Sequence, residues 1–428
     1  MASTAETRRI DLPYGNETVA VNVPARNLRS VLSPNSVAAV RNSDREIQRA
    51  LDEPIGSARL RDVAGGATQA LIIADDMTRL TPVHRIIPFL LEELNAAGMR
   101  DDQITVMIAL GTHRPMTDAE IQQRFGDAVA RRVRVINSPW TDPEQMQDLG
   151  TTDQGTPISI ARMAIDADIV IGLGSIVPHH IPGFSAGAKI VQPGISGAAT
   201  TGATHFLSTR TRRSYLGSVE NVIRHEMEAI AERVGLTAVL NTVLNQDGEV
   251  VAAVYGDQRQ AFRRGVELSR TVYGVPFREQ ADIVIASSYP CDIEFWQAHK
   301  SLYPADMAVK DSGAIIVLTP CPEGVSVTHQ DMLEITALDA ARIESMIDRG
   351  EMDDVVSGGL ALAWARIRER ADVSIVSGGI SDTDARALAF TPYQSVEEAL
   401  AAALRKHGEE ATINVLTHAP DLLPMLEQ

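Results

Sequence analysis

Four polar segments of the sequence carry side chains that can bind an anion, move a proton or ligate a metal. In the first, residues 75–82, Asp76 and Arg79 stand close together. An arginine fork binds a carboxylate or phosphate through paired hydrogen bonds. The simpler interpretation is a helix start, with Thr81 as N-cap and Pro82 in the first turn. That interpretation leaves Asp76 and Arg79 unexplained, so we expect both to serve a binding site.

The second segment, residues 111–117, contains His113 and Arg114. Histidine gains and loses a proton near neutral pH, which suits a general acid or base. A loop histidine is more often only solvated, and Thr117 is a plausible N-cap for the helix that follows. However, the carboxyl ends of parallel strands meet at one edge of a sheet. We therefore expect His113 to lie near Arg79.

The third segment, residues 172–197, is rich in glycine and proline and holds the doublet His179-His180. A long irregular segment inside a compact domain is usually functional. Its glycines, Gly183 and Gly187 among them, can expose backbone N–H groups to an anion. Lys189 is the only lysine or arginine of the segment, and we expect it to anchor a ligand by charge or by a covalent bond.

Three nucleotide or nucleophile motifs compete for this glycine-rich segment. A phosphate-binding P-loop and a dinucleotide-binding fingerprint both fail on spacing. The pattern G-x-S-x-G is matched by residues 183–187, which makes Ser185 a candidate nucleophile and a serine hydrolase the alternative function. A nucleophile elbow should pass directly from strand to helix. Pro178 and Pro182 interrupt that passage, so the alternative is the weaker one.

The fourth segment, residues 200–207, holds His205. It is either a histidine on a helix surface or a ligand that shares a site with Lys189. Imidazole without nearby cysteine suits nickel, zinc or copper. Because the chain lacks H-E-x-x-H and C-x-x-C motifs, the remaining metal donors would have to come from a cofactor.

The elements that must position these segments follow an α/β pattern. Continuous apolar runs indicate strands buried on both faces, and helical stretches separate them. The expected strands are residues 70–74, 104–110, 133–136, 168–173, 283–286, 314–318, 373–376 and 413–416. The expected helices include residues 82–97, 118–130, 219–234, 339–349 and 395–407. Residues 10–23 are expected to form a hairpin that turns at 14–16.

The length of 428 residues indicates two domains. We expect a first α/β domain at 1–260, a connecting helix at 261–277 and a second α/β domain at 278–428. Each would hold a mostly parallel sheet flanked by helices.

The composition limits the partners and the compartment. The net charge of −17 disfavours nucleic acid and anionic membranes, since basic runs such as Arg210, Arg212 and Arg213 are short. Two cysteines, Cys291 and Cys321, indicate a reducing compartment. With no signal-like start and no apolar run of about 18 residues, the expected location is cytoplasmic.

Together these segments resemble the nickel-dependent lactate racemase family, whose members carry a nickel-pincer nucleotide. The motifs that carry the resemblance are, in order, Asp76-Met77-Thr78-Arg79, Gly111-Thr112-His113-Arg114, His179 with Gly187-Ala188-Lys189, His205, and Trp296-Gln297-Ala298-His299-Lys300. The last of these is similar to the family's Gln-x-x-Lys. The resemblance spans most of the chain and implies a racemase or epimerase of a 2-hydroxy acid such as lactate, malate or a larger acid.

The resemblance also implies the role of each residue. Lys189 would bind the cofactor covalently, His205 would ligate nickel, and the loop of Gly183, Ser185 and Gly187 would contact the nucleotide. His113 and His179 would be the acid/base pair in a cleft between the domains. Arg79, Lys300, Gln297, Asp76 and Trp296 would bind or orient the substrate.

Maturation proteins would supply the cofactor. An inactive cofactor-binding homologue is the other alternative, which the presence of both His113 and His179 disfavours. Trp296 and the His179-His180 doublet depart from the pattern expected of lactate-specific members, and the substrate and the oligomeric state stay open.

Overall fold

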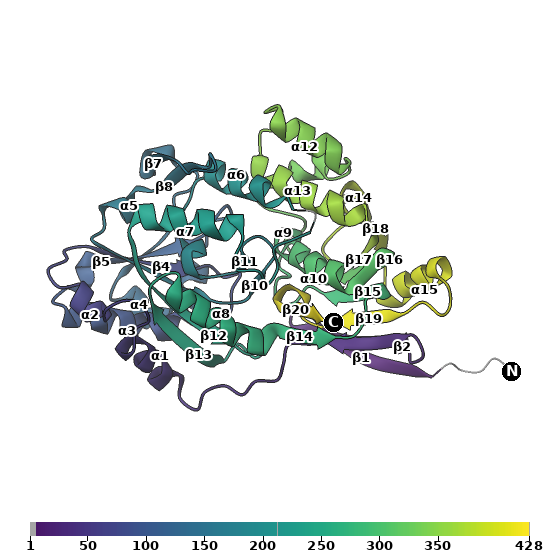
Figure 1. Ribbon diagram of the computed structural model, residues 1–428, viewed down its shortest axis with the longest axis horizontal. Coiled ribbons are helices and arrows are strands. Elements are labelled where there is room, and N and C mark those ends of the chain that lie inside the picture. The colour runs from purple at the N-terminus through teal and green to yellow at the C-terminus, as the bar shows by residue number, and fades with distance from the viewer. Residues whose placement is uncertain (1–5, 212, 428) are drawn as a thin grey trace.

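The computed structural model describes residues 6–211 and 213–427, and two six-stranded sheets dominate it (Figure 1). The first sheet has the order β13-β12-β9-β4-β5-β6, in which only β13 runs antiparallel to its neighbour. Its strands are β4 (Ala70–Asp75), β5 (Ile104–Ala109), β6 (Arg134–Asn137), β9 (Ile169–Ser175), β12 (Leu236–Leu244) and β13 (Val250–Gly256).

Helices cover both faces of this sheet, because its strands are apolar on both sides. In β4, Leu71 and Ile73 point into one core, whereas Ile72 and Ala74 point into the other. The elements of this half are α1 (Ser43–Asp52), α2 (Leu60–Val63), α3 (Val83–Ala96), α4 (Asp118–Ala130), β7 (Met146–Thr151), β8 (Pro157–Ala161), α5 (Arg162–Asp166), α6 (Ala198–Ser208), α7 (Val222–Val234) and α8 (Gln260–Tyr273).

The second sheet is wholly parallel, with the order β18-β17-β16-β15-β19-β3. Its strands are β3 (Leu28–Leu32), β15 (Ala281–Ser287), β16 (Val309–Leu318), β17 (Ala371–Val376), β18 (Thr391–Tyr393) and β19 (Ile413–Leu416). The helices of this half are α9 (Phe295–Ala298), α10 (Leu302–Ala308), α11 (Met332–Ile335), α12 (Ala340–Asp348), α13 (Val355–Arg368), α14 (Asp382–Ala387) and α15 (Val396–His407). Two layered sheets confirm the expected α/β class.

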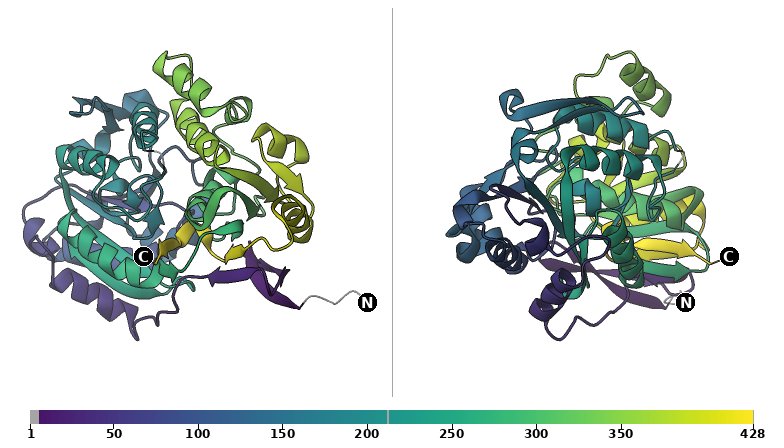
Figure 2. Two further views of the ribbon diagram at one scale, coloured as in Figure 1. Left: turned by 45° about the vertical axis from the view of Figure 1, so that its right-hand side comes forward. Right: turned by 60° about the vertical axis from the view of Figure 1, so that its left-hand side comes forward.

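The N-terminal strands belong spatially with the second sheet (Figure 2). The hairpin of β1 (Thr7–Tyr14) and β2 (Glu17–Pro24) packs Leu12 and Val21 against Ile283 and Ile413, and β3 pairs with β19. The expected unit 1–260 therefore does not correspond to one sheet. The one-sided alternation of the hairpin calls for an apolar partner, and nothing in its sequence indicates which sheet supplies it.

The link between the halves also differs in detail from a single helix. After α8, β14 (Gly274–Phe277) pairs with β20 (Leu423–Leu426) near the C-terminus. The long loop after β9 contains the short β10 (Pro178–His179) and β11 (Gly183–Phe184) and a 3-10 turn, η3 (Gly187–Ile190). Two further 3-10 turns, η4 (His299–Ser301) and η5 (Ala419–Asp421), lie in the second half.

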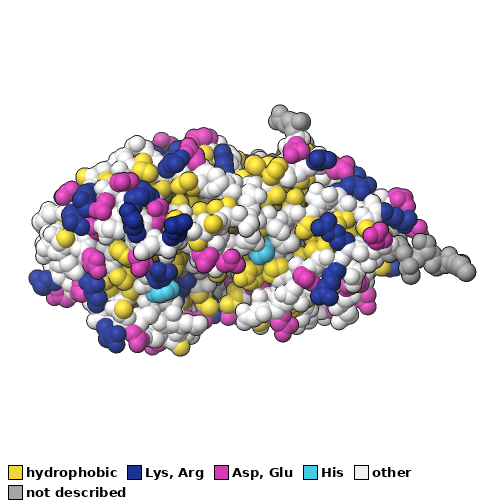
Figure 3. All heavy atoms as spheres, turned by 90° about the horizontal axis from the view of Figure 1, so that it is seen from below, with side chains coloured by type: hydrophobic (Ala, Val, Ile, Leu, Met, Phe, Trp, Pro, Cys, Tyr) yellow, Lys and Arg dark blue, Asp and Glu magenta, His cyan; other side chains and the backbone are white. Residues whose placement is uncertain are grey.

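The surface carries charged side chains of both signs. On the face drawn in Figure 3, basic and acidic side chains are interspersed. Of the basic run, Arg212 lies outside the described residues. No helix among the residues described is long and apolar enough to cross a membrane.

Candidate active site

A cavity that is partly open to solvent lies where the carboxyl ends of β4, β5 and β9 face α9 and η4 of the second half. Both halves contribute to its wall, as expected of a cleft between domains. Ten of the residues singled out in the sequence line it: Asp76, Arg79, His113, His179, Ser185, Lys189, His205, Trp296, Gln297 and Lys300. Gly183 and Gly187 are not in its lining.

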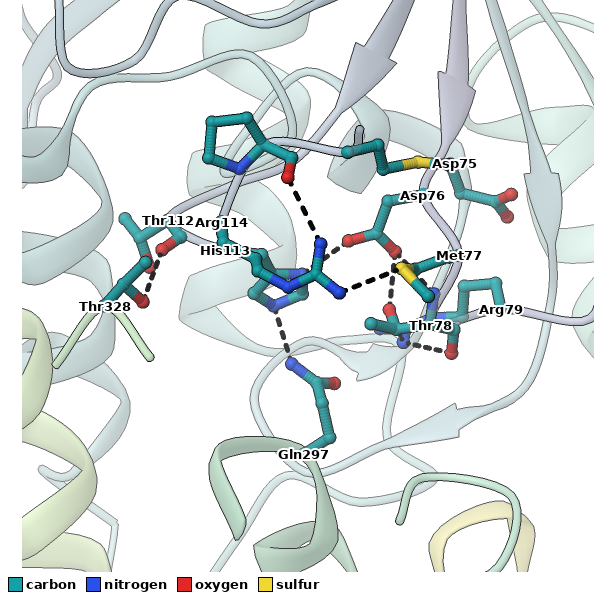
Figure 4. A network of polar contacts seen from close by, with 12 residues as sticks. Asp75, Asp76, Met77, Thr78, Arg79, Thr112, His113, Arg114, Gln297 and Thr328 are labelled. Carbon is teal, nitrogen blue, oxygen red and sulfur yellow. Dashed lines mark hydrogen bonds and ion pairs between the residues drawn. The ribbon is translucent and has the colours of Figure 1, made fainter. Parts of the chain in front are cut away.

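Asp76 and His113 form a close pair at the sheet edge (Figure 4). Asp76 Oδ2 lies 2.6 Å from His113 Nδ1, and Asp76 Oδ1 accepts hydrogen bonds from the backbone and hydroxyl of Thr78. Burial alone would raise the pKa of Asp76, but the charges of His113 and Arg79 bring it below its usual value. An ionised Asp76 holds the proton of His113 on Nδ1 and leaves Nε2 with a lone pair.

Gln297 connects His113 to Lys300. The Gln297 side-chain nitrogen lies 2.7 Å from His113 Nε2, and Lys300 Nζ donates to Gln297 Oε1. Because Lys300 has only protons to offer, it fixes the amide so that Gln297 donates to His113. Both neighbours of His113 thus select the same tautomer, in which the Nε2 lone pair accepts the N–H of Gln297.

Two cations stand beside this pair. Arg79 donates to the carbonyl and hydroxyl of Thr78 and has no carboxylate partner in the described parts of the chain. Burial lowers the pKa of Lys300 to about 8, and the charge of Arg79 contributes. Burial raises the pKa of Asp421, in η5, to about 6 despite the attraction of Arg79 and Lys300. The two cations can therefore receive the carboxylate of a ligand.

His179 presents the opposite tautomer to that of His113. Its Nδ1 accepts a hydrogen bond of 3.2 Å from the backbone N–H of Ile181, so in the neutral ring the proton sits on Nε2. Burial and the charge of Lys189 lower the pKa of His179 well below its usual value. The ring is stacked on His180, with centroids 4.6 Å apart.

The glycine-rich loop is shaped by close packing. Gly183 has φ +85°, and a Cβ there would lie 1.6 Å from the backbone oxygen of Ser218. Gly187 has φ +57° and packs against the ring of Phe262. Arg224 is buried, stacks over that ring, and donates to the backbone oxygens of Phe184 and Ala186. These contacts fix the turn that carries Lys189 into the cavity.

Lys189 is an amine held without a counter-ion. Its side chain makes no hydrogen bond or ion pair with any residue the structure describes, and it lines the cavity. Burial, with the charges of Arg79, Lys300 and Arg224, lowers its pKa well below the usual value. A partly neutral amine in such a setting is nucleophilic.

His205 is oriented as a metal ligand would be. It lies in α6, and its Nδ1 is 2.8 Å from the backbone oxygen of Thr201. The proton therefore belongs on Nδ1, and Nε2 is left with its lone pair. Burial lowers the pKa of His205 to about 4, so the ring is neutral near pH 7. A hydrogen bond from the other ring nitrogen to a backbone oxygen commonly fixes the orientation of an imidazole that ligates a metal.

Ser185 lacks the surroundings of a hydrolase nucleophile. Its hydroxyl donates to the backbone oxygen of Ser175 at 2.6 Å and accepts from the N–H of Val177. No histidine among the described residues bonds to it. Ser185 follows the short β11 and is followed by a 3-10 turn, so it does not stand between a strand and an α-helix. The hydroxyl closes the loop, and the geometry gives the hydrolase alternative no support.

One local expectation was wrong. Thr81 does not cap α3, which begins at Val83 after Pro82. Its hydroxyl donates to the buried Asp75 at 2.6 Å and lies 2.7 Å from the hydroxyl of Ser175. The hydroxyl is thus bound to the buried carboxylate, and no side chain caps the start of α3. Thr117 does cap α4 as expected.

The sequence analysis missed a second Asp–His pair, which comes from the second half. His329 Nδ1 contacts Asp354, the N-cap of α13, while His329 Nε2 lies 3.1 Å from the hydroxyl of Thr112. The His329 ring stacks on Trp296 at 3.8 Å. This pair joins the loop of His113 to the second half. The one feature of the sequence that could have indicated this pair is a histidine in a loop that follows an apolar strand.

An ion-pair contact reinforces that junction. Arg114 bonds to Glu120 in its own half and to Glu323 in the second, both at 2.8 Å. Thr328 also donates to the backbone oxygen of Thr112. The loop that carries His113 is thus held by side chains of both halves.

Comparison with known proteins identifies relatives over nearly the whole chain. Residues 14–217 match the lactate racemase N-terminal domain, and residues 277–421 match the lactate racemase C-terminal domain. A lactate racemase of Thermoanaerobacterium thermosaccharolyticum is 29% identical over 426 residues, covering 95% of this chain and 97% of the relative. A lactate racemase of Lactiplantibacillus plantarum is 31% identical over 323 residues, covering 74% of this chain and 75% of the relative.

Solved structures agree in fold. The lactate racemase apoprotein of Thermoanaerobacterium thermosaccharolyticum superposes with a TM-score of 0.88 at 27% identity, over 98% of this chain and all of that one. A Thermotoga maritima protein reaches a TM-score of 0.71 at 19% identity, over 90% of this chain and 98% of its own, a likeness of fold alone.

Proposed function

The chain belongs to the lactate racemase family, and we propose that it racemises or epimerises a 2-hydroxy acid at C2. The observation that carries the proposal is the chain of contacts from Asp76 through His113 and Gln297 to Lys300. It sets a base beside two cations, in the same cavity as Lys189 and His205. That arrangement suits a small acid with a carboxylate and a neighbouring hydroxyl.

The carboxylate would be held by Arg79 and Lys300, with Gln297 assisting. Opposite charges attract more strongly in a cleft that is partly shielded from water than on an open surface. With the carboxylate fixed there, the C2 hydroxyl lies within reach of His113. The buried face of Trp296 limits the space left for the rest of the molecule.

His113 and His179 would serve as the acid/base pair. His113 has a lone pair on Nε2 that would accept the proton of the C2 hydroxyl once that hydroxyl takes the place of the Gln297 N–H, and Asp76 would stabilise the imidazolium that results. His179 is a neutral ring with its proton on Nε2, so it would donate to the C2 oxygen only after it has taken up a second proton. A racemase needs a group for each hand of the substrate, and two imidazoles of which one is neutral while the other is protonated would meet that need.

The cavity fits the nickel-pincer nucleotide that family membership implies. Lys189 would hold it through a thioamide, since its amine has no partner among the described residues and its pKa is lowered by burial. His205 would ligate nickel through Nε2, a donor that nickel accepts readily. When bound, the cofactor supplies a reversible acceptor for the hydrogen and electron pair of C2. Gly183, Ser185 and Gly187 serve the cofactor by shaping the loop of Lys189, and maturation proteins would deliver it.

The test is to load the protein with cofactor and incubate it with single enantiomers of 2-hydroxy acids. Chiral chromatography should show the opposite enantiomer, and intact mass and metal analysis should show an adduct with one nickel. Lys189→Ala should carry no adduct and give no second enantiomer. A protein that carries the adduct and nickel yet racemises no 2-hydroxy acid would refute the proposal.

A further inference from the structure

Beside the acid/base pair lies a group of buried polar side chains that this chemistry does not use. Both ring nitrogens of His180, Nδ1 of His299 and the hydroxyl of Tyr303 have no well-formed hydrogen bond within the described chain. The indole N–H of Trp364 lies beside the Tyr303 hydroxyl as a donor. Buried polar groups are nearly always paired in folded proteins, and leaving one unpaired is costly. A cluster of three such side chains indicates a ligand.

Stacking determines which part of His180 a ligand can reach. Its ring lies flat on Tyr303, with centroids 3.8 Å apart and planes 4° apart, and His179 covers the other face. His299 meets it edge to face at 5.0 Å. Since both faces are covered, His180 presents its nitrogens only along the edge.

His180 stands between two cavities. It lines the cavity of His113 and Lys300, and it also lines an adjoining one with Tyr303, Ser208 and Thr209. A substrate whose carboxylate lies between Arg79 and Lys300 would direct its remaining carbons past His180. The cluster is therefore placed to read the substituents on C3 and beyond.

The side chains of the cluster are uncharged near pH 7. Burial, together with His299, keeps the pKa of His180 well below its usual value, so near pH 7 the ring has one donor and one acceptor. In the adjoining cavity, Arg370 is paired with Asp306 and Arg366 with Glu344. Beside His180, a second carboxylate would meet neutral rings, and the one arginine of the adjoining lining without an acidic partner among the described residues is the exposed Arg213.

Hydroxyl groups complement this lining better than a carboxylate does. Ser208 donates its proton to the backbone oxygen of His205, and Thr209 donates to that of Phe206, so both hydroxyl oxygens remain as acceptors. An acceptor needs a ligand that brings a proton, which an ionised carboxylate lacks. A ligand hydroxyl both donates and accepts, as neutral histidine and tyrosine do.

We propose that His180, His299 and Tyr303 form a subsite for hydroxyl groups beyond C2, and that the substrate is a polyhydroxylated 2-hydroxy acid. The inference rests on the proposed function and narrows it. An acid with a methyl group at C3 leaves the cluster without partners. The subsite explains why the loop carries a second histidine after His179.

The experiment compares acids of equal carbon number with the cofactor-loaded protein. Glycerate is paired with lactate, 2,3,4-trihydroxybutanoate with 2-hydroxybutanoate, and malate tests a second carboxylate. We expect kcat/KM for the hydroxylated member of each pair to exceed that of its partner at least tenfold. Equal values, or malate as the best substrate, would overturn the subsite while leaving racemisation intact.

Two variants test which residues cause the preference for hydroxylated acids. Tyr303→Phe removes one oxygen and keeps the stacked ring, and His180→Phe keeps a ring without nitrogens. Each should reduce the ratio of kcat/KM between paired acids about tenfold. The matched control is Tyr255→Phe, because the Tyr255 hydroxyl is also buried and unpaired but lies in the other core. A ratio that changes equally in the control would contradict the assignment.

A binding measurement separates this inference from the proposed function. Calorimetric titration of the apoprotein with glycerate and lactate requires no turnover. Tighter binding of glycerate in the wild type, lost in Tyr303→Phe, would support the subsite even if no acid is racemised. Equal binding of the two acids would overturn it. Failure of every acid to racemise in the loaded protein would count against the function alone.

Discussion

His113 Nε2 lies 2.7 Å from the side-chain nitrogen of Gln297, although the two residues come from different halves of the molecule. The contact is made at the nitrogen that must accept a proton. Because Lys300 holds the Gln297 amide in place, the second half fixes both the tautomer and the position of the base in the first. The protonation state of the base therefore depends on a residue of the other half.

Asp76→Asn should leave the base His113 in place but make it less able to accept a proton. An amide has no charge to stabilise the imidazolium, and its N–H can turn the His113 tautomer so that Nε2 is protonated. We expect kcat to fall about 10²–10⁴-fold, the usual contribution of a general base. Initial rates from each pure enantiomer provide the measurement, with Asp168→Asn, a surface carboxylate, as control.

The loss should be unequal between the two hands. For a racemic pair the equilibrium constant is one, so kcat/KM must stay equal in both directions. An asymmetric role for His113 therefore appears as different kcat values compensated by KM. Identical kcat values in both directions for Asp76→Asn and for His179→Ala would remove these residues from separate acid/base roles.

The lowered pKa of Lys300 predicts how KM depends on pH. Its pKa is lowered to about 8 by burial, so the ammonium is lost as the pH rises through 8. If Lys300 holds the carboxylate, KM should rise by roughly tenfold per pH unit above that point. Lys300→Arg, which stays charged, should remove the rise. A KM that is flat to pH 10 in the wild type, or a 2-hydroxy amide that is processed as well as its acid, would exclude this role.

Replacing Lys189 should not lower the stability of the folded protein, in contrast to replacing most other residues that line the cavity. Its pKa is lower in the folded protein than in the unfolded chain, so the folded state disfavours the charged amine. Lys189→Met in the apoprotein should leave Tm unchanged or raise it by about 2–4 °C at pH 7. The stability of the wild type rises with pH up to about 10.5, so the difference should shrink there. A variant that melts well below the wild type at pH 7 would contradict the charge argument.

The parts of the site that could be predicted are those that follow strands of the first sheet. Asp76, His113 and Lys189 each come after an apolar strand, and parallel strands bring such segments to one edge. Gln297 and Lys300 required the family resemblance, because they lie on short turns with no periodic signal. The N-terminal hairpin was expected as a hairpin, but its sheet could not be read from its own residues.

Other residues were missed because their role depends on packing between the halves. Tyr303 is an ordinary apolar residue of α10 until the stacked His180 is seen beside it. Asp421 lies near the C-terminus, and only the fold brings it to Arg79 and Lys300. Spacing along the chain contains no information about such pairs, since the distance between the partners is set by how two sheets dock.

The last prediction concerns His329 and Asp354, which hold the loop of His113 from the second half. Asp354 also accepts hydrogen bonds from the backbone at the start of α13, so Asp354→Asn should lower the free energy of unfolding by about 1–3 kcal/mol. Thr112→Val removes only the hydroxyl that meets His329 and spares the cap. If the pair positions the loop, Thr112→Val should lower kcat several-fold with little change in Tm. Urea unfolding and initial rates measure the two effects, and a Thr112→Val enzyme with wild-type kcat would restrict His329 to a structural role.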